Sequence, residues 1–146
     1  MILWRVSRFR DLKGAGGLKA SGRWHTAGQP IVYLAETPAG AVLEVCVHTA
    51  SNNIPPSITL LEIEGPDVPV PSVQPEELQG DWIKDVDVSR PIGDKWLAEG
   101  SAVLLRVPSV IVPCTFNVLF NPAHPQAGEF EITHVHVYPF DVRLKK

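Results

Sequence analysis

Six polar residues interrupt otherwise apolar segments of this chain, and they are the first candidates for chemistry. They are Arg5, Arg23, Tyr33, Glu44, Ser109 and Asn121. Guanidinium groups bind phosphate oxygens through paired hydrogen bonds. A carboxylate suits a ribose hydroxyl or a developing oxocarbenium ion, and a tyrosine offers a flat face to an aromatic ring. Together these residue types suit a small ligand that carries phosphates and a sugar.

Glu44 is the most unusual of the six because nearly all of its neighbours are apolar. It lies in the stretch AVLEVCV, so a helix there has little room for a solvated face. Either the helix exposes one narrow stripe through Glu44, or the carboxylate faces a cleft. Taken alone, the residue is more typical of an exposed stripe. Arg23 beside Trp24 can likewise be a surface guanidinium on an indole, and Arg5 a strand residue paired with an acid.

Two other kinds of site are considered and set aside. His134 and His136 share one face of a predicted strand, and His124 is a third nitrogen donor. No acidic residue follows at a spacing that completes a known site, so we expect no bound metal. Ser109 lacks the G-x-S-x-G pattern of a serine hydrolase and is also explained as a bend residue after proline.

The apolar runs predict an α+β fold, with more strands than helices. Strands are expected at 2–7, 31–35, 57–65, 102–113 and 131–144, with the fourth bent into two at Pro108 and Ser109. Residues 117–125 are expected to be the end of a strand that runs into a loop. Thr37 and Pro38 are typical of a helix start, which predicts a helix to about residue 50. A second helix is expected over 90–99, a glycine-rich loop without a helix over 13–23, and a loop with one short helical turn over 66–80.

Length, charge and cysteine content limit the classes of protein. The 146 residues suit one domain, and the net charge of −3 gives no basic field for a nucleic-acid partner. Cys46 and Cys114 lie in aliphatic runs, so both are expected to be buried, reduced thiols. No apolar stretch is long enough to span a bilayer, and the start of the chain has no signal-peptide pattern. We therefore expect a cytoplasmic protein.

Five motifs occur in an order that resembles a known family. They are LWRVS, GRW, IVYLA followed by AVLEV, the PS of RVPSVIVP, and NVLFNPAHP. In this order they resemble the RES domain toxins of bacterial toxin–antitoxin modules. The motifs span nearly the whole chain, which predicts a single RES domain over 1–146. The resemblance implies a compact domain with a strongly twisted mixed β-sheet and a few helices, similar to ADP-ribosyltransferases.

The resemblance also implies an activity and a role for each of the six residues. Members of this family deplete NAD by cleaving the nicotinamide–ribose bond, with phosphate as acceptor in some and apparently water in others. NAD is then the substrate, inorganic phosphate is a candidate co-substrate, and no cofactor is needed. The implied catalytic residues are Arg23, Glu44 and Ser109. The implied substrate-binding residues are Arg5, Tyr33 and, as the weaker candidate, Asn121.

A partner follows from the same resemblance. An enzyme that destroys NAD needs an inhibitor, which in this family is an antitoxin, usually with an Xre-like DNA-binding part, assembled with the toxin as a hetero-oligomer. Any DNA contact would belong to that partner. Two alternatives stay open: ADP-ribosylation of a protein target, and a decayed module that only binds the antitoxin. The chain departs from the family pattern at Ser21 and His25, and His25 is expected at the mouth of the pocket.

Overall fold

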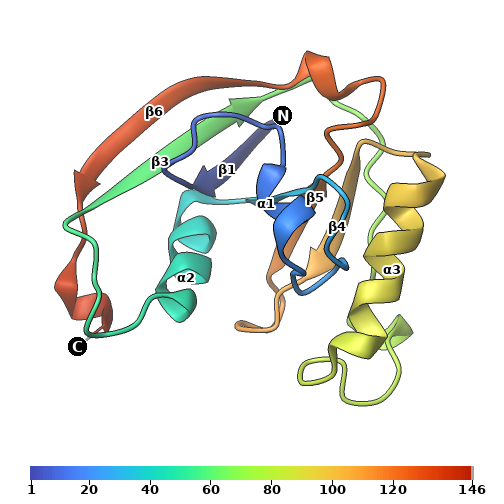
Figure 1. Ribbon diagram of the computed structural model, residues 1–146, viewed down its shortest axis with the longest axis horizontal. Helices are drawn as coiled ribbons and strands as arrows, with labels where there is room; N and C mark the ends of the chain where they lie inside the picture. The colour runs from blue at the N-terminus through green and yellow to red at the C-terminus, as the bar shows by residue number, and fades with distance from the viewer. Residues whose placement is uncertain (146) are drawn as a thin grey trace.

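Six strands of the described chain form one sheet in the order β4-β5-β2-β1-β3-β6 (Figure 1). The computed structural model describes residues 1–145. The strands are β1 (Ile2–Val6), β2 (Val32–Ala35), β3 (Ser57–Glu64), β4 (Leu104–Pro108), β5 (Phe116–Phe120) and β6 (Glu131–Pro139). The helices are α1 (Ala15–Lys19), α2 (Pro38–His48), α3 (Val86–Glu99) and the 3-10 turns η1 (Pro75–Glu77), η2 (Ala127–Glu129) and η3 (Val142–Lys145). The predicted α+β class is confirmed.

The sheet is antiparallel, whereas the resemblance to RES domain toxins implies a mixed sheet. All five pairings between the named strands are antiparallel, and the parallel contact is the isolated bridge between Ser72 and Arg106. The connection through α2 does leave β2 and β3 running in the same direction. However, β1 lies between them and runs opposite to both, so β2 and β3 never pair.

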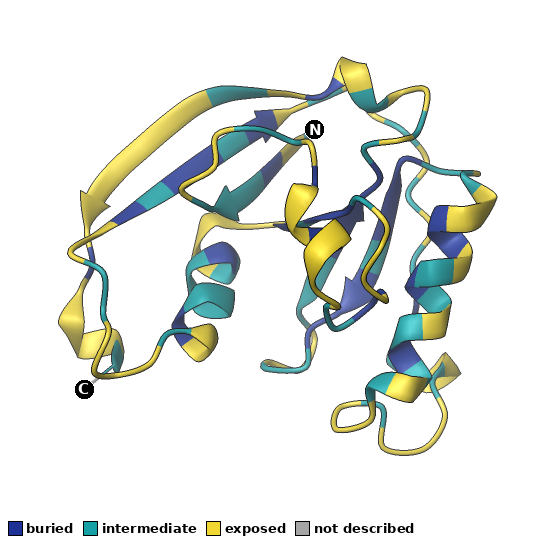
Figure 2. Cartoon of the chain, in the orientation of Figure 1, coloured by how far each residue is buried: buried dark blue, intermediate teal, exposed yellow. Residues whose placement is uncertain are grey.

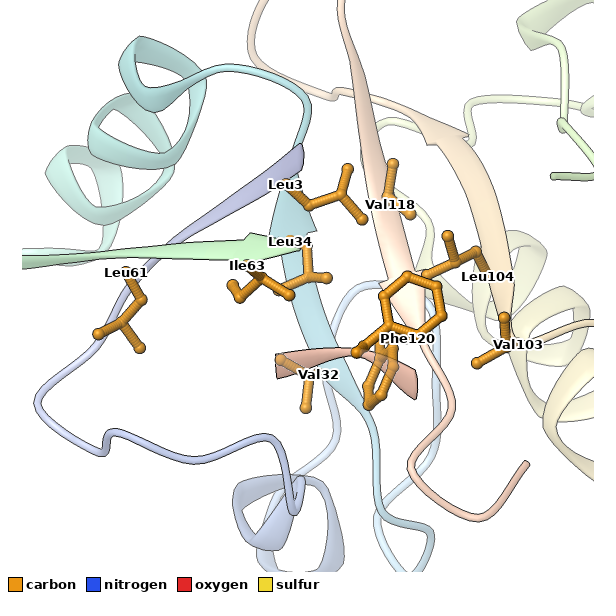
Figure 3. Packing of buried hydrophobic residues seen from close by; sticks show 10 residues of the cluster. Leu3, Val32, Leu34, Leu61, Ile63, Val103, Leu104, Val118 and Phe120 are labelled. Atoms are coloured by element: carbon orange, nitrogen blue, oxygen red, sulfur yellow. The ribbon is translucent and has the colours of Figure 1, made fainter. Parts of the chain in front are cut away.

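Both faces of the sheet are buried over part of their area. One face carries a cluster that includes Leu3, Ile63 and Phe120 (Figure 3). The other face packs Leu119 under α3. Neighbouring residues of a strand point to opposite faces, so Phe120 and Leu119 enter different clusters. The outer strand β6 is exposed along most of its length (Figure 2). Within residues 1–145, no helix is both long and apolar enough to cross a membrane.

The helix α2 begins where its sequence predicts. The Thr37 hydroxyl accepts a hydrogen bond from the Gly40 backbone N–H at 3.0 Å, and Pro38 occupies the first turn. These two features satisfy a free donor and preset the backbone at the helix start. Because α2 follows β2 directly, its position over the sheet is set by the end of that strand.

Two helices differ from the prediction. α3 begins at Val86 instead of Arg90, because the Asp85 carboxylate accepts from the Asp87 N–H at 2.9 Å and starts the helix one turn earlier. α1 lies inside the segment predicted to be a loop without a helix. It is five residues long and follows Gly14, whose φ of 70° is a left-handed conformation that glycine adopts readily.

The segment after β4 also differs from the prediction. A second strand is expected after the bend at Pro108, but residues 109–115 form a turn. The Ser109 hydroxyl accepts from the backbone N–H groups of Ile111 and Val112, at 3.1 and 3.4 Å. These local hydrogen bonds replace strand pairing. The turn leaves Cys114 exposed with a φ of 63°, which corrects the expectation of a buried thiol, while Cys46 is buried as predicted.

α3 holds the loop formed by residues 22–26, called the 22–26 loop below. The hydrogen bonds run from Ser89 Oγ to the Arg23 carbonyl (2.5 Å), from Arg90 Nε to the Gly22 carbonyl (2.9 Å), and from the Thr26 N–H (2.8 Å) and hydroxyl (2.7 Å) to the Asp94 carboxylate. A loop with so many anchors on one helix has little freedom to move relative to that helix. The loop therefore presents Arg23 from a fixed backbone.

Gly93 allows this close contact between α3 and the loop. A Cβ atom at position 93 would overlap the carbonyl oxygen of Trp24, a backbone atom that no side-chain rotation can move aside. Alanine is the better helix former, by about 1 kcal/mol in an exposed helix interior. Here the lack of space opposes that preference.

We expect Gly93→Ala to destabilise the protein despite the gain in helix propensity. Overpacking costs about 1–3 kcal/mol, which lowers the melting temperature by about 3–10 °C in a chain of this size. Gly128→Ala is the matched control, because nothing lies within 4 Å of the added Cβ there. Thermal unfolding followed by circular dichroism measures both. Equal melting temperatures for the two variants would contradict the contact.

Candidate active site

A cleft of about 720 Å³ opens on the face of the sheet that carries α2. This volume is within the usual range for small-molecule sites. Five regions line it: β1, α1 with the 22–26 loop, β2, α2, and the β4 end with β5. The lining residues include Trp4, Arg5, Arg23, Tyr33, Ala41, Glu44, His48, Val110, Ile111 and Asn117.

The cleft lies where β1 and β2 separate. β1 pairs with β3 over five register positions but with β2 at one, Trp4 opposite Ala35. Residues 4–6 of β1 and 33–35 of β2 both line the cleft. Divergence of neighbouring strands thus opens space that a continuous ladder would close.

The position of Glu44 is decided by the helical repeat of α2. Ala41, Glu44, Val45 and His48 all line the cleft. Their spacing of three and four residues places them on one helix face. Cys46, from the other side of α2, instead packs against Ile58 and Phe140. Glu44 therefore faces the cleft and does not form an exposed stripe on the outer surface.

The Glu44 carboxylate is held through one of its two oxygens. Asn117 Nδ2 donates to Oε1 at 2.8 Å, and the Ser109 hydroxyl donates to the same oxygen at 3.4 Å. Among the described residues, Oε2 has no hydrogen-bond partner. A carboxylate fixed in this way has one oxygen oriented by the protein and one left for a ligand.

Arg5 and Arg23 reach the cleft from different elements. Arg5 Nη1 donates to the Asp11 carbonyl at 3.0 Å, and burial lowers the pKa of this guanidinium, with Asp11 opposing the shift. An arginine stays charged at neutral pH even so. Arg23 lies on the 22–26 loop, where Nη1 donates to the Trp82 carbonyl at 3.5 Å. Both side chains keep donors for an anion.

Tyr33 forms the wall of the cleft beside Arg23. Its hydroxyl oxygen accepts from the Trp24 backbone N–H at 3.1 Å and lies 2.8 Å from His25 Nδ1. Burial raises the pKa of the Tyr33 phenol to about 12, and the Trp24 hydrogen bond opposes the shift. The phenol is therefore a protonated hydrogen-bond donor at neutral pH.

One predicted residue lies elsewhere, and one residue was missed. Asn121 is buried outside the cleft lining, and its Oδ1 accepts from the Ala123 N–H at 3.0 Å, as is typical of an Asn-Pro turn. Asn117, four residues earlier, is the asparagine that contacts Glu44. The strand period does not distinguish the two asparagines, because positions 117, 119 and 121 have the same parity. The available signal was Pro122, because an Asn-Pro pair is typical of a turn and not of a strand.

The histidines also differ from expectation. His25 lines the cleft, as expected, but it is 2% exposed, and its Nδ1 contacts the Tyr33 hydroxyl instead of facing solvent. His134 and His136 are exposed on β6, where both lie within 3.5 Å of Glu62. Within residues 1–145, no group of three metal-binding side chains is placed to hold an ion.

The arrangement suits chemistry at a sugar carbon next to phosphates. Two guanidinium groups can bind phosphate oxygens, and Tyr33 can face an aromatic ring. A carboxylate in a largely apolar cleft stabilises positive charge more strongly than it does in water. Among the residues described, Glu44 has no hydrogen bond to a histidine or to a second carboxyl group. The arrangement therefore suits a leaving group that departs without protonation.

Comparison with known proteins gives the same family for nearly the whole chain. The model of the RES domain matches residues 2–143. Toxin Res of Pseudomonas putida KT2440 is 49% identical over 134 residues, covering 90% of this chain and 92% of that protein. The Prs ADP-ribosylating toxin of Sphingobium sp. YBL2 is 40% identical, covering 92% of this chain and 86% of that toxin.

A solved structure agrees in fold. It is the crystal structure of the M. tuberculosis MbcT–MbcA toxin–antitoxin complex, matched with a TM-score of 0.75. The match covers 99% of this chain and 86% of that chain at 17% identity, which supports the fold alone. The family model and the relatives cover nearly all 146 residues, and from them we conclude that this chain belongs to the RES domain family.

Proposed function

We propose that this protein is the toxin of a toxin–antitoxin pair and that it depletes NAD by breaking the nicotinamide–ribose bond. The observation that carries the proposal is Glu44, a carboxylate fixed by Asn117 in a cleft that two arginines also line. Support for the toxin role comes from relatives named Toxin Res, one of them 49% identical.

The proposed substrate fits the cleft by chemistry. The pyrophosphate of NAD provides acceptors for Arg5 and Arg23. The nicotinamide ring can lie against Tyr33, and the ribose hydroxyls can reach the free oxygen of Glu44. In this binding mode the reacting anomeric carbon lies near the carboxylate.

The reaction needs little acid–base help because nicotinamide in NAD is already cationic. Breaking the bond from the anomeric carbon to the ring nitrogen leaves the electron pair on nitrogen, which gives neutral nicotinamide. The sugar carbon becomes oxocarbenium-like, and the Glu44 carboxylate stabilises that charge. An anionic oxygen of inorganic phosphate, or a water molecule that gives up one proton to the solvent, then adds to the anomeric carbon. Ser109 helps to orient Glu44.

A second candidate acceptor is a side chain of another protein. The relative named Prs ADP-ribosylating toxin is 40% identical, and its name describes ADP-ribosylation of a target called Prs. Bond cleavage by Glu44 would be the same, and the difference lies in what enters the cleft after nicotinamide leaves. The cleft residues in hand do not favour a protein acceptor over phosphate or water.

The partner belongs to the same proposal. We expect an antitoxin, of the Xre type suggested by the sequence resemblance, that binds this chain in a hetero-oligomer and suppresses its activity. The solved structure with the same fold is a toxin–antitoxin complex. The proposal gives this chain no direct contact with DNA, and it places the activity in the cytoplasm, where NAD is present.

A time course of NAD consumption tests the activity and identifies the acceptor. Antitoxin-free protein is incubated with NAD in phosphate buffer and in phosphate-free buffer, and products are followed by NMR. Nicotinamide release that requires phosphate, with ADP-ribose-1″-phosphate as product, indicates a phosphorylase. Equal release with free ADP-ribose indicates a glycohydrolase. Release only with added cell protein, which becomes labelled, indicates the ADP-ribosylating alternative. No release under any condition contradicts NAD cleavage.

We expect Glu44→Gln to retain the fold and to lower turnover by about 100-fold or more, as loss of one preorganised electrostatic group typically does. Glutamine keeps an oxygen for Asn117 and Ser109 but removes the negative charge. Nicotinamide release measures turnover, and thermal unfolding measures stability. Glu129→Gln, at an exposed position on η2, controls for loss of a charge. Near-normal turnover in folded Glu44→Gln protein would rule out the proposed role.

A matched pair of asparagine variants tests the contact to Glu44. Asn117→Ala removes a hydrogen bond to a charged group, which is worth about 1.5–3 kcal/mol, so we expect turnover to fall about 10- to 100-fold. Asn121→Ala removes a hydrogen bond in a turn outside the cleft, so its effect should be on melting temperature and not on the turnover of folded protein. The reverse pattern would place the functional asparagine at 121.

A further inference from the structure

We propose that His25 is a positioning residue that fixes the Tyr33 ring at the wall of the cleft. The proposal rests on the proposed function in one respect, namely that Tyr33 contacts the substrate. His25 is 2% exposed, and its ring lies 5.7 Å from the Tyr33 ring, measured between centroids. It lines the cleft, but both of its ring nitrogens lie within hydrogen-bond distance of protein groups, so we assign it a role through Tyr33.

The tautomer of His25 follows from its partners. Nε2 lies 3.2 Å from the carbonyl oxygen of Gly17, which can only accept, so Nε2 carries the proton. In the neutral ring Nδ1 is then an acceptor. It lies 2.8 Å from the Tyr33 hydroxyl and 3.2 Å from the Gly22 N–H, and both of these groups can donate to it.

The same reasoning assigns both hydrogen bonds of the Tyr33 hydroxyl, the one that it donates and the one that it accepts. Its single proton points to His25 Nδ1, and its oxygen accepts from the Trp24 N–H at 3.1 Å. The oxygen therefore has one donor and one acceptor in defined directions. Because both the proton and the oxygen of the hydroxyl are hydrogen-bonded, the end of the Tyr33 ring is fixed, and so is the orientation of the ring plane that faces the cleft.

Gly22 shows how closely the loop fits over this pair. A Cβ at position 22 would overlap the Tyr33 hydroxyl and would lie 3.0 Å from His25 Nδ1. The next residue, Arg23, is the guanidinium of the 22–26 loop that lines the cleft. His25 thus links the position of Tyr33 to the loop that presents Arg23. A hydrophobic residue of similar size at position 25 would fill the space without this link.

Two substitutions at position 25 separate positioning from packing. In His25→Asn, the side-chain oxygen can take the place of Nδ1 and accept from Tyr33, while the donor to Gly17 is lost. In His25→Gln, the longer side chain can place its NH2 at the position of Nε2 and donate to Gly17, while the acceptor for Tyr33 is lost. The pair keeps opposite halves of the network.

The expected result is a difference in KM. Losing a contact that orders a binding side chain weakens ground-state and transition-state binding alike, so KM for NAD should rise with little change in kcat. We expect a rise of about tenfold for His25→Gln, about the effect of one hydrogen bond, and recovery to within about threefold of wild type for His25→Asn. Equal KM values for the two variants, or a higher KM for His25→Asn, would overturn the proposal.

A double-mutant comparison shows whether His25 acts through Tyr33. Tyr33→Phe keeps the ring and removes the hydroxyl, so the difference between His25→Asn and His25→Gln should disappear in that background. A difference of the same size in both backgrounds would mean that His25 acts by another route, and this would overturn the proposal.

NMR provides a readout that does not depend on the activity. The chain has five histidines and two tyrosines, so subtraction of variant spectra assigns both side chains. We expect an unprotonated Nδ1 and a protonated Nε2 for His25, and a slowly exchanging Tyr33 hydroxyl proton that is lost in His25→Gln and kept in His25→Asn. A protonated Nδ1 would overturn the proposal. If this pattern is present but wild-type protein releases no nicotinamide, the proposed function fails while the positioning role stands.

Discussion

The hydrogen bond from Asn117 to Glu44 is the contact on which the cleft depends. A carboxylate among apolar side chains is costly unless its oxygens are paired. The 2.8 Å bond meets that cost at one oxygen. It also joins α2 to β5, because the β2–β5 register places Asn117 opposite Ala35, shortly before α2 begins. The bond therefore stabilises the fold and leaves the second oxygen of Glu44 unpaired for a ligand.

The opposite wall of the cleft is held by a different part of the chain. The 22–26 loop has no regular secondary structure, yet α3, more than sixty residues later, hydrogen-bonds it at several points. The contact of Gly93 with Trp24 brings helix and loop to their closest approach. A binding group on a loop is usually mobile. Here Arg23 is carried by a loop that is fixed to a helix, so the position of its backbone is set by the fold.

The features that the sequence predicts well are those set by residues that are neighbours in the chain. The start of α2 depends on Thr37 and Pro38, which are neighbours in sequence, and it is predicted to the residue. The partner of Glu44 depends on strand register, which no single strand encodes, so reasoning from the sequence selected Asn121 instead of Asn117. His25 is buried by Tyr33 and by α1, and α1 has only five residues, which is too short for a helical pattern of apolar residues to appear in the sequence. Features set by neighbouring residues can therefore be predicted from the sequence, while contacts between distant residues cannot.

The net charge of the whole chain does not describe the charge around the cleft. Net charge is −3, yet residues 5–23 contain six of the thirteen basic residues and one acidic residue, Asp11. This segment supplies Arg5, α1 and Arg23 to the cleft. Interactions between exposed charges fade over about 10 Å at ordinary salt, so a ligand at the cleft responds to this local excess more than to the distant carboxylates. A molecule with two phosphates is attracted to such a rim, while the acidic remainder disfavours the long polyanionic surface of a nucleic acid.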